Sequence, residues 1–144
     1  MTGARRGVVR LFVVGLSLAL ASCSFGGGID VRGDEYAFDN MPVELEEAEH
    51  LFQFTNTGKE AHEMVVVRLS DGSASIPDAL RLPEQDAMAR LEVVGRSFAE
   101  PGQNGAKVKA QLEPGRYALV CFLPVAGSGP PHFTRGMLRE FTVG

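Results

Sequence analysis

Short apolar runs separated by turn residues are the feature that most restricts how this chain can fold. Phe52 and Phe54 alternate with polar residues, as a half-buried strand requires, because successive side chains of a strand point to opposite faces. Runs rich in Val, Phe and Leu and bounded by Gly, Pro, Asp or Asn lie at 29–32, 35–38, 50–56, 63–69, 106–112, 116–121 and 138–143. This pattern predicts an all-β fold, an antiparallel sandwich of about 7–8 strands.

One stretch departs from the strand pattern. Between residues 76 and 91 the apolar side chains do not alternate, and Pro83-Glu84-Gln85 is a sequence that can begin a helix. We therefore expect one or two short helices inserted in a long connection between strands.

The segment from Leu112 to Tyr117 adds a topological clue. It contains a Pro-Gly turn followed by a tyrosine at the start of a strand. This arrangement resembles the tyrosine corner of Greek-key sandwiches, in which the phenol hydrogen-bonds to backbone upstream. We therefore predict a Greek-key β-sandwich with a short helical insertion, and a structural role for Tyr117.

The first 22 residues have the character of an export signal. Arg5, Arg6 and Arg10 precede an apolar stretch over 11–21. That stretch is shorter than the roughly 20 residues of a bilayer-spanning helix and fits the apolar region of a signal peptide. The arginine pair leaves open whether export uses the general or the twin-arginine route.

The end of this segment, Leu20-Ala21-Ser22-Cys23, resembles the bacterial lipobox, whose Cys becomes the lipidated first residue of the mature protein. We predict a lipoprotein signal peptide over 1–22, lipid attachment at Cys23 with a flexible tether over 23–28, and one domain over 29–144. The domain would then be anchored to the cell membrane on its extracytoplasmic side. An ordinary secretory signal with an unmodified Cys23 is the alternative.

Charge restricts the binding partners. Removal of residues 1–22 would leave 11 basic and 18 acidic residues, a formal charge of −7. Nucleic acids and anionic lipid headgroups attract clusters of Lys and Arg, so we expect no nucleic-acid partner and no membrane contact beyond the lipid anchor. Lys59-Glu60 and Glu46-Glu47 are interpreted as solvated surface.

Four side chains have the character of a metal site. Cys121 ends an apolar run, His132 and Met137 follow it, and His62 lies in a separate segment. Apart from Cys23, Cys121 is the only cysteine of the chain, so it has no disulfide partner within the predicted domain. Each residue alone has an ordinary structural explanation. Together they match a trigonal His2Cys copper site with a weak axial Met, the geometry of electron-transfer copper proteins.

The spacing of these residues resembles the cupredoxins, the superfamily of plastocyanin and azurin. The likeness rests on Asn56-x-Gly58-x3-His62, on the turn before Tyr117, and on Cys121-x10-His132-x4-Met137. The resemblance implies a cupredoxin-like fold and one copper ion, Cu(I) or Cu(II), held by His62, Cys121, His132 and Met137. It also implies that the backbone N–H of Glu63 donates a hydrogen bond to the thiolate.

One departure concerns the ten residues between Cys121 and His132, a longer loop than small soluble carriers of this family have. Gly127, Ser128 and Gly129 supply a turn and Pro130-Pro131 stiffen the return to His132. We expect His132 to be the route by which electrons leave, with its ring edge among Pro124, Val125, Pro130, Pro131 and Phe133 as an apolar docking patch.

The predicted function is one-electron transfer by a membrane-anchored mononuclear (type 1) copper protein. Its partner would be a redox protein or a membrane oxidase, and no small-molecule substrate would be transformed. A copper storage or delivery lipoprotein and a metal-free β-sandwich binding module are the alternatives. We expect no enzyme. A hydrolase in particular is disfavoured, because the sequence has no Gly-x-Ser-x-Gly elbow or His-Glu-x-x-His motif.

Overall fold

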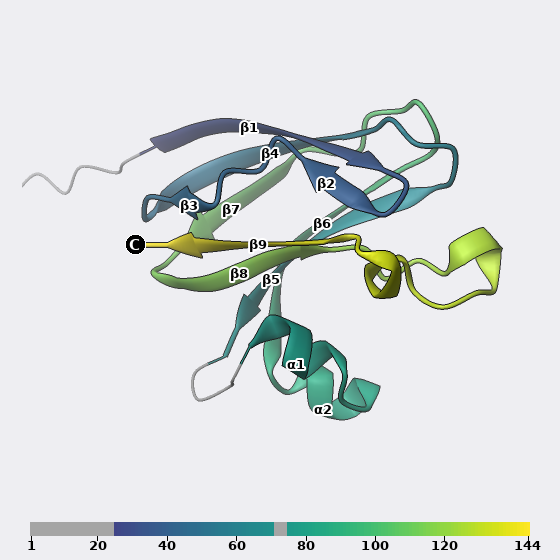
Figure 1. Ribbon diagram of the computed structural model, residues 1–144. Coiled ribbons are helices and arrows are strands. Elements are labelled where there is room, and N and C mark those ends of the chain that lie inside the picture. Colours follow the sequence, from purple (N-terminus) through teal and green to yellow (C-terminus); the bar gives the residue numbers. More distant parts are fainter. Residues whose placement is uncertain (1–24, 71–74) are drawn as a thin grey trace, which may run out of the picture.

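The computed structural model describes residues 25–70 and 75–144. The predicted signal peptide and the predicted lipid attachment at Cys23 lie outside these residues. Within the described part, nine strands form two sheets packed face to face (Figure 1). The first sheet has the order β2-β1-β4-β7: Ala37–Asp39, Phe25–Asp34, Ala48–Asn56 and Val108–Leu112.

The second sheet has the order β3-β9-β8-β5-β6: Glu44–Leu45, Leu138–Val143, Gly115–Val120, His62–Leu69 and Leu91–Ala99. The chain passes repeatedly from one sheet to the other, as in the predicted all-β Greek-key sandwich. Both sheets are mixed, because β1 runs parallel to β4 and β3 runs parallel to β9. The prediction of a purely antiparallel sandwich was therefore wrong in this detail: the chain visits β3 in the second sheet between β2 and β4 and returns in the direction of β1.

The main core lies between the two sheets. Alternate residues of β4 point into it, including Phe52 and Phe54, which are fully buried. From the other sheet, Tyr117, Leu119 and Cys121 enter the same cluster. This period of two confirms the strand prediction for β4 and places the thiol at the end of the packed interior.

A second apolar cluster lies on the outer face of the five-stranded sheet. Two short helices, α1 (Ile76–Leu80) and α2 (Glu84–Met88), lie against that sheet in Figure 1, as predicted for this stretch. Ile76 and Ala79 pack with Val65, Val67 and other residues of β5, β8 and β6. Strand β5 is therefore buried on both faces, which explains its nearly continuous apolar sequence. Among the described helices, none is long and apolar enough to cross a bilayer.

The tyrosine corner is present. The phenolic O–H of Tyr117 donates to the carbonyl of Glu113 at 2.8 Å and its oxygen accepts the N–H of the same residue at 3.2 Å. The ring is buried and stacks on Phe141 at 5.3 Å between centroids. Tyr117 thus fixes the turn that leads into β8, the strand that Cys121 directly follows.

Strand β6 was not predicted. Its burial does not alternate regularly, it contains Gly95, and its pairing with β5 is interrupted by a bulge between Val66 and Val67. It forms the edge of its sheet and takes its conformation from β5, so its own sequence carries a weak signal. Strand β1 begins at Phe25, within the segment predicted to be a tether.

Candidate metal centre

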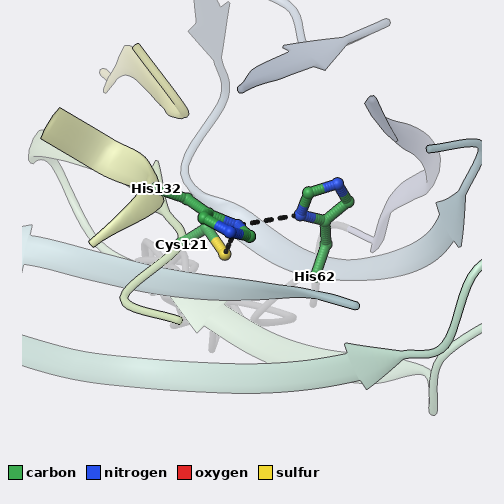
Figure 2. A group of neighbouring side chains, drawn as sticks. All are labelled: His62, Cys121 and His132. Carbon is green, nitrogen blue, oxygen red and sulfur yellow. Dashed lines mark hydrogen bonds between the residues drawn. The ribbon is translucent and has the colours of Figure 1, made fainter. Parts of the chain in front are cut away.

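Two strand ends and one loop at the same end of the sandwich bring His62, Cys121 and His132 together (Figure 2). His62 is the first residue of β5 and Cys121 directly follows β8, and these two strands are hydrogen-bonded neighbours. His132 begins the 3-10 helix η2 (His132–Arg135) in the connection from β8 to β9. Strand pairing therefore places the first two side chains, and the loop returns the third.

The three side chains aim their ligand atoms at one point. These atoms all lie within 4.8 Å of one another. The two Nδ1 atoms are 3.0 Å apart, and Sγ of Cys121 is 3.4 Å from Nδ1 of His132. All three residues are buried. One sulfur and two imidazole nitrogens in a sheltered trigonal arrangement fit copper, because thiolate suits Cu(I) and imidazole suits both oxidation states.

Met137 lies beside this group. It is fully buried between η2 and β9, its N–H donates to the carbonyl of His132, and its carbonyl accepts the N–H of Cys121, both at 3.2 Å. A side chain at Gly33 would meet the Met137 methyl group, whose carbon is 3.1 Å from the place of a Cβ there. Glycine at this position thus leaves room for the thioether, and the ligand role of Met137 stays a prediction.

The thiol has the backbone donor that the resemblance implied. The N–H of Glu63 lies 3.4 Å from Sγ of Cys121. Burial raises the pKa of this thiol, while the N–H groups of Glu63 and Leu123 act in the opposite direction. A metal ion must therefore replace the thiol proton, and these N–H groups stabilise the thiolate that results.

The loop before His62 is held in place by Asn56. This residue belongs to the sequence motif Asn56-x-Gly58-x3-His62, but no role was predicted for it. Asn56 is fully buried. Its Nδ2 donates to the carbonyls of Glu60 at 2.8 Å and Ala99 at 2.9 Å, and its Oδ1 accepts the N–H of Gly58 at 2.9 Å. One side chain thus ties the loop to itself and to the end of β6, so that His62 enters β5 in a fixed position.

The long loop after Cys121 closes on itself and returns to His132, and the return to His132 was predicted. Pro124 and Pro131 form an isolated β-bridge, and the N–H of Val125 donates to the carbonyl of Pro130 at 3.0 Å. At the base of the loop, the N–H of His132 donates to the carbonyl of Leu123 at 2.8 Å. The tip turns through Gly127, whose φ of 76° is left-handed. The length of the loop is therefore compatible with an ordered ligand at His132.

Comparison with solved structures shows which known folds this architecture resembles. The reduced auracyanin of Roseiflexus castenholzii superimposes with a TM-score of 0.54 at 20% identity, covering 81% of this chain and 96% of that protein. Auracyanin A of Chloroflexus aurantiacus, described as a "blue" copper protein, gives 0.53 at 20% identity, covering 83% and 100%. The fold is that of the cupredoxins. No protein-family model and no curated protein matches the sequence.

The residues around the outer edge of the His132 ring differ from the apolar docking patch that was predicted there. His132 is only 1% exposed, and Tyr36 packs edge-on against its ring at 5.2 Å between centroids. Its Nε2 lies 3.4 Å from a carboxylate oxygen of Glu60. The prediction of an apolar edge among the loop prolines was therefore wrong, because residues from the β1–β2 turn and from the β4–β5 loop cover the ring.

His62 has a similar neighbour. Its Nε2 lies 3.6 Å from a carboxylate oxygen of Glu35, and the ring is fully buried. Burial lowers the pKa of His62, and the adjacent His132 lowers it further. The neutral imidazole, which is the form that binds metals, is thus favoured. Neither Glu35 nor Glu60 was predicted to belong to the site, since a surface glutamate gives no sequence signal of such a contact.

Proposed function

We propose that this protein is a type 1 copper protein that carries single electrons, with His62, Cys121, His132 and Met137 holding one copper ion. The observation that supports this most directly is the convergence of two Nδ1 atoms and one Sγ in a buried cluster. Copper bound there would supply the change between Cu(I) and Cu(II). The likeness of the fold to that of auracyanins agrees with the proposal.

The ligand cage suits an electron carrier better than an enzyme. His62 and Cys121 are fixed by strand pairing and His132 by backbone hydrogen bonds, so little needs to rearrange when the charge of the ion changes. With Met137 as the fourth ligand, the protein supplies every coordination position, whereas catalytic metal sites keep one open. We therefore infer that no small-molecule substrate is transformed.

The cellular setting rests on the N-terminal sequence. The signal-like segment over 1–22 and the lipobox-like Cys23 support export and attachment to the outer side of the cell membrane by lipid. A carrier held there would exchange electrons with another redox protein or with a membrane oxidase. The acidic composition argues against a nucleic-acid partner.

The test is to add Cu(II) to the purified full chain and to record its visible absorption and electron spin resonance. A type 1 site gives an intense thiolate-to-copper band, and Cys121→Ser abolishes it. If the wild type acquires no such band, or if Cys121→Ser retains it, the proposed function is wrong. A biological activity that Cys121→Ser leaves unaltered would instead support the metal-free binding module.

Copper storage or delivery remains the second candidate, because it would use the same soft ligands. Fast transfer of Cu(I) to an apo acceptor would favour it, and tight retention with reversible redox behaviour would favour electron transfer. Complete burial of His62 and Cys121 favours retention, since an acceptor protein cannot reach these ligands without opening the site.

A further inference from the structure

One ring nitrogen of each ligand histidine is buried without an evident hydrogen-bond partner. Nε2 of His62 and Nε2 of His132 are buried and have no hydrogen-bond partner. A buried N–H without a partner costs about 1–3 kcal/mol, so such atoms call for an explanation. In both rings the neighbouring group is a carboxylate: Glu35 lies 3.6 Å from His62, and Glu60 lies 3.4 Å from His132.

Both carboxylates are held in place by other groups. Glu35 accepts the backbone N–H groups of Lys59 and Glu60, the latter at 3.0 Å. Glu60 accepts the N–H of Ala126 at 2.7 Å and the phenolic O–H of Tyr36 at 3.0 Å. These donors lower the pKa of both carboxyl groups. The side chains are only 30% exposed, so two fixed negative charges stand behind the two imidazoles.

The local backbone is adapted to these contacts between carboxylates and imidazoles. Tyr36 has a φ of 65°, a left-handed conformation that is unfavourable for a tyrosine. That conformation accompanies a ring that packs on His132 and a hydroxyl that bonds to Glu60. At Gly58, a Cβ would lie 2.5 Å from Oε1 of Glu35 and 2.8 Å from Nε2 of His62. Glycine there leaves the approach of the carboxylate to the ring open.

We propose that Glu35 and Glu60 are positioning residues that keep the ring protons of His62 and His132 on Nε2, so that both Nδ1 lone pairs face the metal. The opposite tautomer would set an Nε2 lone pair against a carboxylate, which is repulsive. The inference rests on the proposed copper function. It goes further in assigning to the two carboxylates a share in setting the reduction potential.

The effect on potential follows from charge. A carboxylate that accepts the second ring proton makes the imidazole a stronger donor, and loss of such a partner typically lowers metal affinity by about 10–100-fold. The negative charge stabilises Cu(II) more than Cu(I), because attraction scales with the charge of the ion. Each carboxylate therefore lowers the potential, and its neutralisation raises it.

The experiment compares Glu35→Gln and Glu60→Gln with the wild type as copper-loaded full chains. Glutamine keeps the size of the side chain and an oxygen that accepts the backbone N–H groups, but removes the charge. Glu44→Gln is the matched control, because it makes the same change on an exposed residue of β3, which pairs with the far end of β9. Glu60→Asp keeps the charge but withdraws it from the ring.

Two readouts separate positioning from simple support of the fold. In the Cu(I) form, nuclear magnetic resonance reports the Nε2–H protons. We expect the signal of His62 to shift upfield and exchange faster with water in Glu35→Gln, and that of His132 to do so in Glu60→Gln. A tenfold loss of Cu(II) affinity relative to Cu(I) would raise the potential by about 59 mV. Glu60→Asp should give a smaller rise, and Glu44→Gln should change neither readout.

The inference is overturned if the two glutamine variants match Glu44→Gln in potential and in Nε2–H signals while the thiolate-to-copper band is intact. It is equally overturned if the Cu(I) form of the wild type carries its ring protons on Nδ1. In either case the proposed copper function stands as long as the thiolate-to-copper band is present. Absence of the band from the wild type would instead remove the proposed function, and the inference with it.

Discussion

Asn56 offers a sharp test of how the loop before the first ligand is held. Asn56→Asp keeps the shape of the side chain and an oxygen for the N–H of Gly58. It replaces the Nδ2 donor by an oxygen that faces the carbonyls of Glu60 and Ala99, at 2.8 and 2.9 Å. Two hydrogen bonds are lost at about 0.5–1.5 kcal/mol each, and buried acceptors are left unpaired. We expect the free energy of unfolding to fall by about 3 kcal/mol.

The same change introduces a pH dependence with a definite sign. A buried carboxyl beside two carbonyl oxygens has a folded-state pKa above its unfolded value of about 3.9. As the pH rises, the unfolded chain loses its proton first, so the variant becomes less stable from about pH 4 upward until the folded-state pKa is reached. The amide of Asn56 does not titrate, so this position makes no such contribution to the stability of the wild type.

The assay is urea unfolding of the metal-free chain at several pH values. Asn104→Asp is the matched control, because Asn104 is exposed and its Oδ1 accepts the hydroxyl of Thr55 at 2.7 Å, a bond that Asp preserves. Exposed substitutions of this kind stay within about 0.5 kcal/mol. If Asn56→Asp lies within about 0.5 kcal/mol of this control, the side chain of Asn56 does not hold the loop and the reasoning fails.

Three further predictions concern the frame and the site. Tyr117→Phe removes both hydrogen bonds to the turn before β8 and should lower the free energy of urea unfolding by about 1 kcal/mol; an unchanged value would contradict the corner. Gly58→Ala places a methyl group between Glu35 and His62 and should weaken copper binding in a competition titration, whereas Gly144→Ala, with nothing nearby, should not. Burial lowers the pKa of His62 below 6.5, so the unfolded chain takes up this proton first as the pH falls. The stability of the metal-free chain should be full above about pH 6.5 and decrease below it, measured by urea unfolding. His62→Asn should remove this part of the decrease, and a decrease of equal size in that variant would contradict the assignment.

The main elements of the fold could be predicted because they leave local signals. The alternation at Phe52 and Phe54 identified β4, and the Pro-Gly turn before Tyr117 identified the corner. The ligand candidates were found because a thiol, imidazoles and a thioether at this spacing are rare in combination and have a shared chemistry. The structure brings His62, Cys121 and His132 into one cluster and places Met137 beside it.

The remainder depends on contacts between segments that are far apart in sequence. Glu60 meets Ala126 across 66 positions, and nothing in the sequence Lys59-Glu60 distinguishes a fixed carboxylate from the solvated surface that was predicted there. The cover over His132 was missed for the same reason, since Tyr36 comes from another turn. Strand β6 is an edge strand whose conformation is imposed by β5, so its own side-chain pattern could not reveal it.

The site and the core are specified by the same register. In β8 and the residue that follows it, Tyr117, Leu119 and Cys121 point into the space between the sheets, while Ala118 and Val120 face the outer cluster. Val65 of β5 pairs with Val120. This pairing places the thiol of Cys121 close to the start of β5, whose first residue is His62. A slip of one residue between these strands would move every side chain of β8 to the opposite face. It would remove the tyrosine of the corner from the main core and turn the thiol away from both imidazoles, so selection for a packed core also maintains the geometry of the ligands.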